Sequence, residues 1–386
     1  MLTLRRCLGA VLAGAMLACL TVVADTSQTG PAEPARVDFN YQIRPLLSDR
    51  CFRCHGPDSG KRKKELRLDR REGLLKDIGD GWAIVKPGDP DRSELIRRIF
   101  SDLDDDVMPP PDSHLALSSE DKALLERWVV EGAEYRPHWS LAPVRKAKVP
   151  RLRDDVETTN PIDGFVRARL AAEGIPPAPP ASPEALIRRV ALNLTGLPPT
   201  PAEIDAFLAD RSPSAYARVV ERYLGSPAYG ERMAMDWLDL ARYADTYGYQ
   251  ADVDRDMSPY RDWVIRAFND DLPYDQFLTW QLAGDLLPNA SREQRIATAF
   301  NRLHRQTNEG GSVEEEFRTE YVTDRVNTFG TAMLGLTLEC ARCHDHKFDA
   351  ITQRDYFSLF AFFSNIDESG LYSHFTNATP SPSMLL

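Results

Sequence analysis

The chain has 386 residues and lacks the composition that several large classes of protein require. It has 47 Lys and Arg against 58 Asp and Glu, a net charge of −11, so it lacks the dominant basic face that binds nucleic acid or an anionic lipid surface. At 42% hydrophobic and 27% charged residues it is not a disordered, collagen-like or polytopic membrane protein. It has no glycine-rich phosphate loop, and alternating strand-like patterns are scarce, so we expect a mainly α protein.

Residues 1–24 have the pattern of a cleaved export signal. Arg5 and Arg6 precede an apolar run, and Val22-Val23-Ala24 leaves small residues before the expected cut. A retained membrane anchor and lipidation at Cys19 are the alternatives, although a run of about 17 apolar residues is marginal for spanning a bilayer. The segment removes two positive charges and no acid, so −11 becomes −13. We therefore expect an acidic protein that is periplasmic or otherwise exported.

Cysteine is rare: there are six, and Cys7 and Cys19 lie in the expected signal. The other four form two copies of one motif, Cys-x-x-Cys-His. Two thiols at this spacing can form thioethers with the two vinyl groups of one haem, and the next imidazole then reaches the iron. The motifs predict two sites for haem c, formed by Cys51, Cys54 and His55 and by Cys340, Cys343 and His344.

A disulfide, a thiol redox pair and a zinc site each account for less of the motif than haem does. A disulfide gives no reason for a histidine directly after each cysteine pair. A thioredoxin-like redox pair is expected in a βαβ context, and none precedes either motif. Zinc could bind two thiolates and a histidine, but a closed structural site needs a fourth ligand. A metal or thiol site stays open as an alternative for the second motif.

Residues 36–140 have the layout of a small class I cytochrome c-like domain. An apolar helix face leads into the first motif, and a helix with a capping-box-like start at Ser118 closes the segment. Met108 lies between them in an irregular, proline-rich loop, where core packing is a poor reason for a methionine. It follows His55 by 53 residues, enough to reach the other face of a haem. We expect Met108 to be the distal ligand, whose thioether stabilises ferrous iron.

A larger helical domain is expected after the first. Residues 141–160 are rich in Lys, Arg, Pro and Asp and predict a linker. Residues 161–370 have apolar positions at helical spacing and contain the second motif, and residues 371–386 form a tail.

A second haem would also need a distal ligand. His346 is only two residues from His344 and is too close to reach the opposite face of the ring. His304, some forty residues upstream, is our candidate, with a plain buried or surface histidine as the alternative. A five-coordinate iron would instead permit chemistry on peroxide or another small molecule.

Three carboxylates, Glu316, Glu320 and Asp324, fall at i, i+4 and i+8 of an expected helix. A solvated acidic stripe is the simplest interpretation. If that face turned toward His344 and His346, it could build a metal site instead of a haem crevice.

Several longer stretches resemble a known family. The first part resembles the planctomycete-type cytochrome c domain in Val37-Asp38-Phe39, Cys51-Phe52-Arg53-Cys54-His55-Gly56-Pro57, Leu66-Arg67-Leu68-Asp69, Pro87-Gly88-Asp89-Pro90 and Met108-Pro109-Pro110. The remainder resembles its companion domain of unknown function in Leu194-Thr195-Gly196-Leu197-Pro198-Pro199-Thr200, Tyr260-Arg261-Asp262-Trp263-Val264, Gln281-Leu282-Ala283-Gly284-Asp285 and Cys340-Ala341-Arg342-Cys343-His344-Asp345-His346-Lys347-Phe348-Asp349.

The resemblance covers roughly residues 37–370. It implies a covalent haem with His55 as proximal and Met108 as distal ligand, and it supplies no reaction for the second part. Such proteins usually continue into a further large C-terminal domain, whereas this sequence stops soon after, in Thr379-Pro380-Ser381-Pro382. That domain is expected to be absent or to reside on another chain.

Together these features predict an exported c-type cytochrome with covalent haem at the first motif and a second haem at the other. Its expected role is electron transfer, and its acidic surface favours a basic redox partner. One alternative is a haem- or metal-dependent periplasmic enzyme, peroxidase-like, in which the second motif is catalytic and the cytochrome domain supplies electrons. Another is a non-redox scaffold with structural metal.

Overall fold

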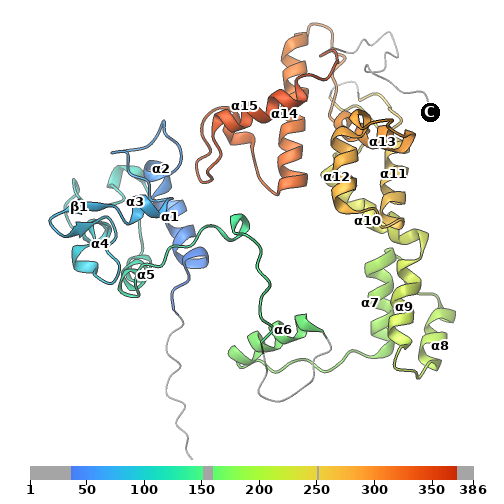
Figure 1. Cartoon of the computed structure of the whole chain (residues 1–386), viewed down its shortest axis with the longest axis horizontal. Helices are drawn as coiled ribbons and strands as arrows, with labels where there is room; N and C mark the ends of the chain where they lie inside the picture. The colour runs from blue at the N-terminus through green and yellow to red at the C-terminus, as the bar shows by residue number, and fades with distance from the viewer. Residues whose placement is uncertain (1–35, 151–159, 250–251, 372–386) are drawn as a thin grey trace, which may run out of the picture.

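The computed structural model describes residues 36–150, 160–249 and 252–371 (Figure 1). Helices predominate in these ranges, and the prediction of a mainly α protein with a larger helical part after residue 160 is confirmed. None of the helices described there is long and apolar enough to cross a lipid bilayer. The expected signal, residues 151–159 of the expected linker and the tail from residue 372 lie outside the described residues.

The first part of the chain is built from short helices and one small antiparallel sheet. Its regular elements are η1 Phe39–Ile43, α1 Arg44–Arg50, α2 Phe52–His55, α3 Arg71–Leu74, β1 Asp77–Gly79, β2 Trp82–Ala83, η2 Pro90–Arg92, α4 Glu94–Ile99, η3 Pro111–Ser113, α5 Ser119–Val130 and η4 Trp139–Leu141. The expected capping box is present: Ser118 accepts from the Asp121 amide, and the Asp121 side chain accepts from the Ser118 amide.

One apolar core holds these elements together. It joins α1, α2 and α5 through buried side chains, including Leu47, Phe52 and Trp128. The Trp128 indole N–H donates to the Glu134 carbonyl at 3.1 Å, which satisfies its polar atom inside the core. The helix that carries the first motif is therefore fixed by the packing of Phe52.

The second part contains the longer helices. They are α6 Pro161–Ala172, α7 Pro183–Thr195, α8 Pro201–Ala209, α9 Ala215–Leu224, α10 Pro227–Leu240, α11 Ser258–Asn269, α12 Tyr274–Ala283, α13 Arg292–Ala297, α14 Glu314–Phe329 and α15 Gln353–Phe363, with shorter turns η5 Gly284–Leu286, η6 Thr298–Arg302, η7 Gly330–Leu334 and η8 Glu339–Arg342. Four of the 28 prolines start helices, because α6, α7, α8 and α10 each begin with proline at N1 after a capping Asn, Ser or Thr.

Three apolar clusters lie in this part. The cluster of α10 to α13 surrounds Trp263 and Phe277, whose rings stack at 5.3 Å. The others join α7 with α9 and α14 with α15. Leu282 packs against both the α10–α13 cluster and the α14–α15 cluster, so α14 lies beside α12 (Figure 1). The second motif lies between α14 and α15, where η8 is located.

Candidate functional site

The first Cys-x-x-Cys-His motif is a single helical turn. The His55 amide donates to the Cys51 carbonyl at 2.9 Å and the Cys54 amide to the same oxygen at 3.1 Å. Positions i, i+3 and i+4 of a helix share one face, so the two thiols and the imidazole lie together. Phe52, on the other side of the turn, is 2% exposed and belongs to the core. Because Phe52 packs in the core, Cys51, Cys54 and His55 lie on the opposite face of the turn.

Burial favours the uncharged forms of Cys51 and His55 in this motif. It raises the pKa of the Cys51 thiol to about 12, with a further contribution from Cys54. It also lowers the pKa of His55, and the charge of Arg98 acts in the same direction. The buried Nδ1 of His55 has no hydrogen-bond partner among the described residues. A neutral imidazole is the form that ligates a metal.

Met108 is connected to His55 indirectly, through Arg98. The Met108 amide donates to the Arg98 carbonyl at 3.1 Å, and the Arg98 side chain is close enough to His55 to lower its pKa. Asp106 pairs with Arg97 and Arg98, which ties the methionine loop to α4. Ligation of iron by Met108 stays a prediction, and the structure places its loop beside an element that acts on His55.

The second motif is more open than the first. Its amide hydrogen bonds to the Cys340 carbonyl are longer, 3.3 Å from Cys343 and 3.4 Å from His344. Both thiols are exposed, and the side chain of His344 is 52% exposed. His344 Nδ1 lies 2.7 Å from the Asp345 carbonyl, which can only accept, so Nδ1 carries a proton and donates it there. All four cysteines of the two motifs are free of disulfides.

The three carboxylates of α14 do not gather round the second motif. Glu320 pairs with Arg342, between the two cysteines, at 2.5 Å, and Asp324 pairs with Arg242 at 2.8 Å. Glu316 is exposed. Within the described residues, no group of three or more His, Cys, Asp or Glu side chains could hold a metal ion. Two of the three carboxylates therefore pair with arginines. The sequence pattern of the carboxylates alone does not show these partners.

His304 is buried, with 1% of its surface exposed, and both ring nitrogens have protein partners. Nδ1 lies 2.9 Å from the Arg305 carbonyl and Nε2 lies 2.7 Å from an Arg325 nitrogen. The ring also stacks on Tyr321, with centroids 4.6 Å apart. Iron ligation by His304 stays a prediction, and it would require Arg325 to give up its hydrogen bond to Nε2.

Arg325 and Glu368 complete a buried charged pair that the sequence pattern does not point to. Arg325 donates to both carboxylate oxygens of Glu368, and its Nε donates to the Asn301 carbonyl at 2.6 Å. Burial alone raises the pKa of Glu368, but the hydrogen bonds from Arg325, with a further contribution from the neighbouring His304, outweigh it and hold that pKa at about 2. The partners are 43 residues apart, so no local spacing marks them.

The two motifs meet at one contact between the two parts of the chain. Ser59, four residues after His55, donates its hydroxyl to Asp345 at 3.2 Å. Asp58 Oδ2 lies 3.9 Å from His344 Nδ1. In Figure 1 the loop after α2 and the loop before α15 face each other accordingly. Segments 286 residues apart in sequence are thus neighbours in space.

Comparison with known proteins gives two family matches. The family model PSCyt2, described as a protein of unknown function (DUF1549), matches residues 161–368, more than half of the chain. The model PSCyt1, described as planctomycete cytochrome C, matches residues 51–112, a range that contains the first motif and Met108. No curated protein and no solved structure matches the chain.

Proposed function

Because the chain belongs to the PSCyt2 family of unknown function (DUF1549) and carries a planctomycete cytochrome C domain, we propose that it is an exported dihaem c-type cytochrome that transfers electrons. The cytochrome domain implies haem c in general. The observation that carries the dihaem proposal is the contact of Ser59 with Asp345, which brings the two motifs to the same interface.

The residues of the first motif fit a covalent haem. Zinc would need its ligands to converge on one point, whereas haem c needs two thiols for the ring edge and an imidazole for the iron. Cys51, Cys54 and His55 share a helical face, but no group of three or more such ligands converges in the described part of the chain. The buried Nδ1 of His55 has no hydrogen-bond partner in that part, which supports an imidazole whose polar atoms are not all used by the protein.

Haem c supplies reversible one-electron chemistry between ferric and ferrous iron when it is bound. Cys51 and Cys54 would anchor it and His55 would be the proximal ligand. Met108 would be the distal ligand and raise the reduction potential. Burial lowers the pKa of His55 and so favours the neutral imidazole that ligates iron.

The second motif would hold the other haem through Cys340 and Cys343, with His344 as its proximal ligand. Its greater exposure suits exchange with a partner, while the Ser59–Asp345 contact joins it to the first site. An electron could then pass between the two sites within one chain. With a charge of −13 after signal cleavage, the surface would attract a basic redox partner, and the family's C-terminal domain on another chain is a second candidate.

A second candidate function is a haem-dependent oxidoreductase in which the second site is catalytic. Two observations favour it: the exposure of the second motif, and the engagement of both nitrogens of His304 by other groups. A second iron without a distal protein ligand would be open to peroxide or another small molecule. The cytochrome domain would then supply its electrons.

The test is an intact mass and a reduced-minus-oxidised spectrum of protein exported from a host with haem-attachment machinery. We expect two haem masses above the processed chain, one of which is lost in each of the variants Cys51→Ser and Cys340→Ser. A single haem that only Cys51→Ser removes would leave a monohaem cytochrome. A chain with no covalent haem would rule out the proposal. A high-spin ferric band in the unmodified protein would favour the oxidoreductase.

A further inference from the structure

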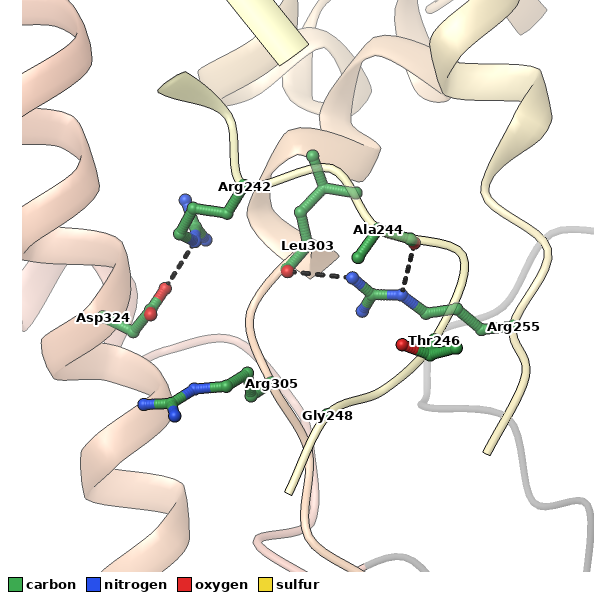
Figure 2. Close-up of a pocket in the computed structure, with 8 residues that line it drawn as sticks. All are labelled: Arg242, Ala244, Thr246, Gly248, Arg255, Leu303, Arg305 and Asp324. Carbon is green, nitrogen blue, oxygen red and sulfur yellow. Dashed lines mark hydrogen bonds and ion pairs between the residues drawn. The ribbon is translucent and has the colours of Figure 1, made fainter. Parts of the chain in front are cut away.

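A cavity of about 300 Å³ lies in the second part of the chain, outside both motifs. It is formed by the segment after α10, the segment after η6 and one face of α14 (Figure 2). Three of its lining side chains are arginines, Arg242, Arg255 and Arg305, against one acid, Asp324. The charged side chains of the lining are therefore mainly positive, although the chain has a net charge of −11.

Hydrogen bonds to backbone carbonyl groups hold the Arg255 guanidinium in the wall of the cavity. The guanidinium donates to the carbonyl groups of Ala244, Leu303 and His304 at 3.0–3.1 Å. Figure 2 shows two of these bonds, which join the segment after α10 to the segment after η6. All of these partners are neutral backbone carbonyls, and Asp245 is the acid whose charge acts on Arg255.

Two nitrogen atoms of Arg242 are hydrogen-bond donors that the protein does not use in the described residues. The Nε of Arg242 lies 2.8 Å from Asp324 Oδ1, but its buried Nη1 and Nη2 make no hydrogen bond within the described residues. A buried donor without an acceptor costs about 1–3 kcal/mol, and more when it is charged. An anionic ligand in the cavity would supply the missing acceptors.

Arg305 is a further cation at the edge of the cavity. It is exposed, its guanidinium lies 4.8 Å from the centre of the Tyr249 ring, and it makes no ion pair in the described part of the chain. In Figure 2, Arg242 lies above and Arg305 below Asp324. Asp324 neutralises one charge, so the two remaining arginines leave the cavity positive.

We propose that this cavity binds an oxyanion, the carboxylate, phosphate or sulfate group of a small molecule, with the Nη atoms of Arg242 that do not face Asp324 and the guanidinium of Arg305 as its donors. A guanidinium fork matches the oxygens of such groups and binds them in bidentate fashion. A volume of about 300 Å³ is at the lower end of ligand pockets, so the molecule that carries the group is small.

The oxyanion has two chemical sources. One is a free small molecule. The other, which depends on the proposed dihaem function, is a propionate of a haem at the second motif. Glu320 and Asp324 are one turn apart on α14, and Glu320 pairs with Arg342 inside that motif. The cavity and the second motif therefore lie along the same helix.

The first experiment is calorimetric titration of the exported holoprotein with malonate and, separately, with inorganic phosphate at constant ionic strength. We expect saturable binding of one molecule of at least one of them. Arg305→Gln, at an exposed position, and Arg242→Lys, which keeps the charge beside Asp324 but loses the fork, should each weaken binding about tenfold or more. Arg189→Gln, on an exposed part of α7, is the matched control and should bind as the unmodified protein does.

A second arm distinguishes the sources. If a haem propionate fills the cavity, the holoprotein will not bind either anion, and the double variant Cys340→Ser, Cys343→Ser will gain binding that Arg305→Gln abolishes. The intact mass reports the haem count separately, so failure of the dihaem proposal is distinguishable. The oxyanion site is disproved if neither protein binds, or if binding survives unchanged in both Arg305→Gln and Arg242→Lys.

Discussion

At the scale of single residues, His304 shows how burial gives a histidine a structural role. Its two nitrogens engage Arg305 and Arg325, and burial lowers the pKa of His304, so the ring is neutral. Removal of the ring would leave a charged Arg325 donor without its acceptor in a site that water does not reach. The same side chain is the candidate distal ligand of a second haem, and one substitution separates the two roles.

We expect His304→Ala to lower the free energy of unfolding by about 2–4 kcal/mol, because it creates a cavity and leaves a buried donor unsatisfied. Urea denaturation measures this, with His138→Ala, at a partly exposed site, as the control. The ferric spectrum of the folded variant reports ligation. Conversion of a low-spin haem to high spin would establish His304 as a ligand, whereas an unchanged spectrum would leave it a structural residue. A variant as stable as the control would contradict the role of the buried network.

At the scale of elements, helix starts were the most predictable feature. The serine and acid that begin α5 form a reciprocal pair, and the same arrangement recurs at α8, α13 and α15. Each box depends on residues three positions apart, which any sequence displays. The serine cap of α5 and the glutamate charge at the start of α8 can each be tested by substitution.

Ser118→Ala should lower the free energy of unfolding by about 1 kcal/mol, because the Asp121 amide loses its acceptor at the start of α5. The control is Ser119→Ala, one residue further on, which removes a hydroxyl that caps nothing. Denaturant titration of both variants checks the difference. Equal stability of the two would mean that the box contributes nothing.

The charge of Glu203 should make the start of α8 sensitive to acid. Its hydrogen bond from the Thr200 amide lowers the pKa of the Glu203 carboxyl. A carboxyl with a lowered pKa stabilises the fold above its ordinary pKa of about 4.3, and this contribution is lost as the pH falls through the lowered value. Glu203→Gln keeps an acceptor but has no such charge.

Glu203→Gln should therefore be less stable than the unmodified protein at pH 7, by about 0.5 kcal/mol, and this difference should be smaller at pH 3. Urea unfolding at both pH values gives the comparison. Glu120→Gln, at an exposed first-turn position of α5, is the control for the general effect of a lost charge. A difference that is the same at both pH values would contradict the assignment.

At the scale of the whole molecule, the contact between the two motifs is the central feature. It rests on four polar residues, of which Ser59 and His344 are exposed, Asp345 is partly exposed and Asp58 is buried. Each such interaction contributes little in water, about 1 kcal/mol or less. A like charge at the contact should therefore be enough to open it.

Ser59→Asp places a carboxylate opposite Asp345 and should increase the radius of gyration measured by small-angle X-ray scattering. Ser119→Asp adds the same charge at an exposed helix start and should leave the radius unchanged. If two haems are attached, the same variant should slow electron exchange between them, as followed by pulse radiolysis. A radius equal to that of the control would show that this contact does not hold the two parts together in solution.

The sequence by itself determined what depends on neighbours within a turn or two: the helical class, the capping box at Ser118 and the two haem-type motifs. A thiol–thiol–imidazole face follows from the spacing of Cys51, Cys54 and His55 alone, since i, i+3 and i+4 share a side of any helix. The family resemblance rests on the same local stretches, and the family matches confirm it.

Only the tertiary structure decided which distant groups meet. The carboxylates of α14 were visible as a stripe, but their partners Arg342 and Arg242 come from other segments. The partners of His304, the contact of Ser59 with Asp345 and the arginine-lined cavity likewise join residues far apart in the chain. Such pairs depend on how helices pack, and packing is set by the whole apolar core, not by any short pattern.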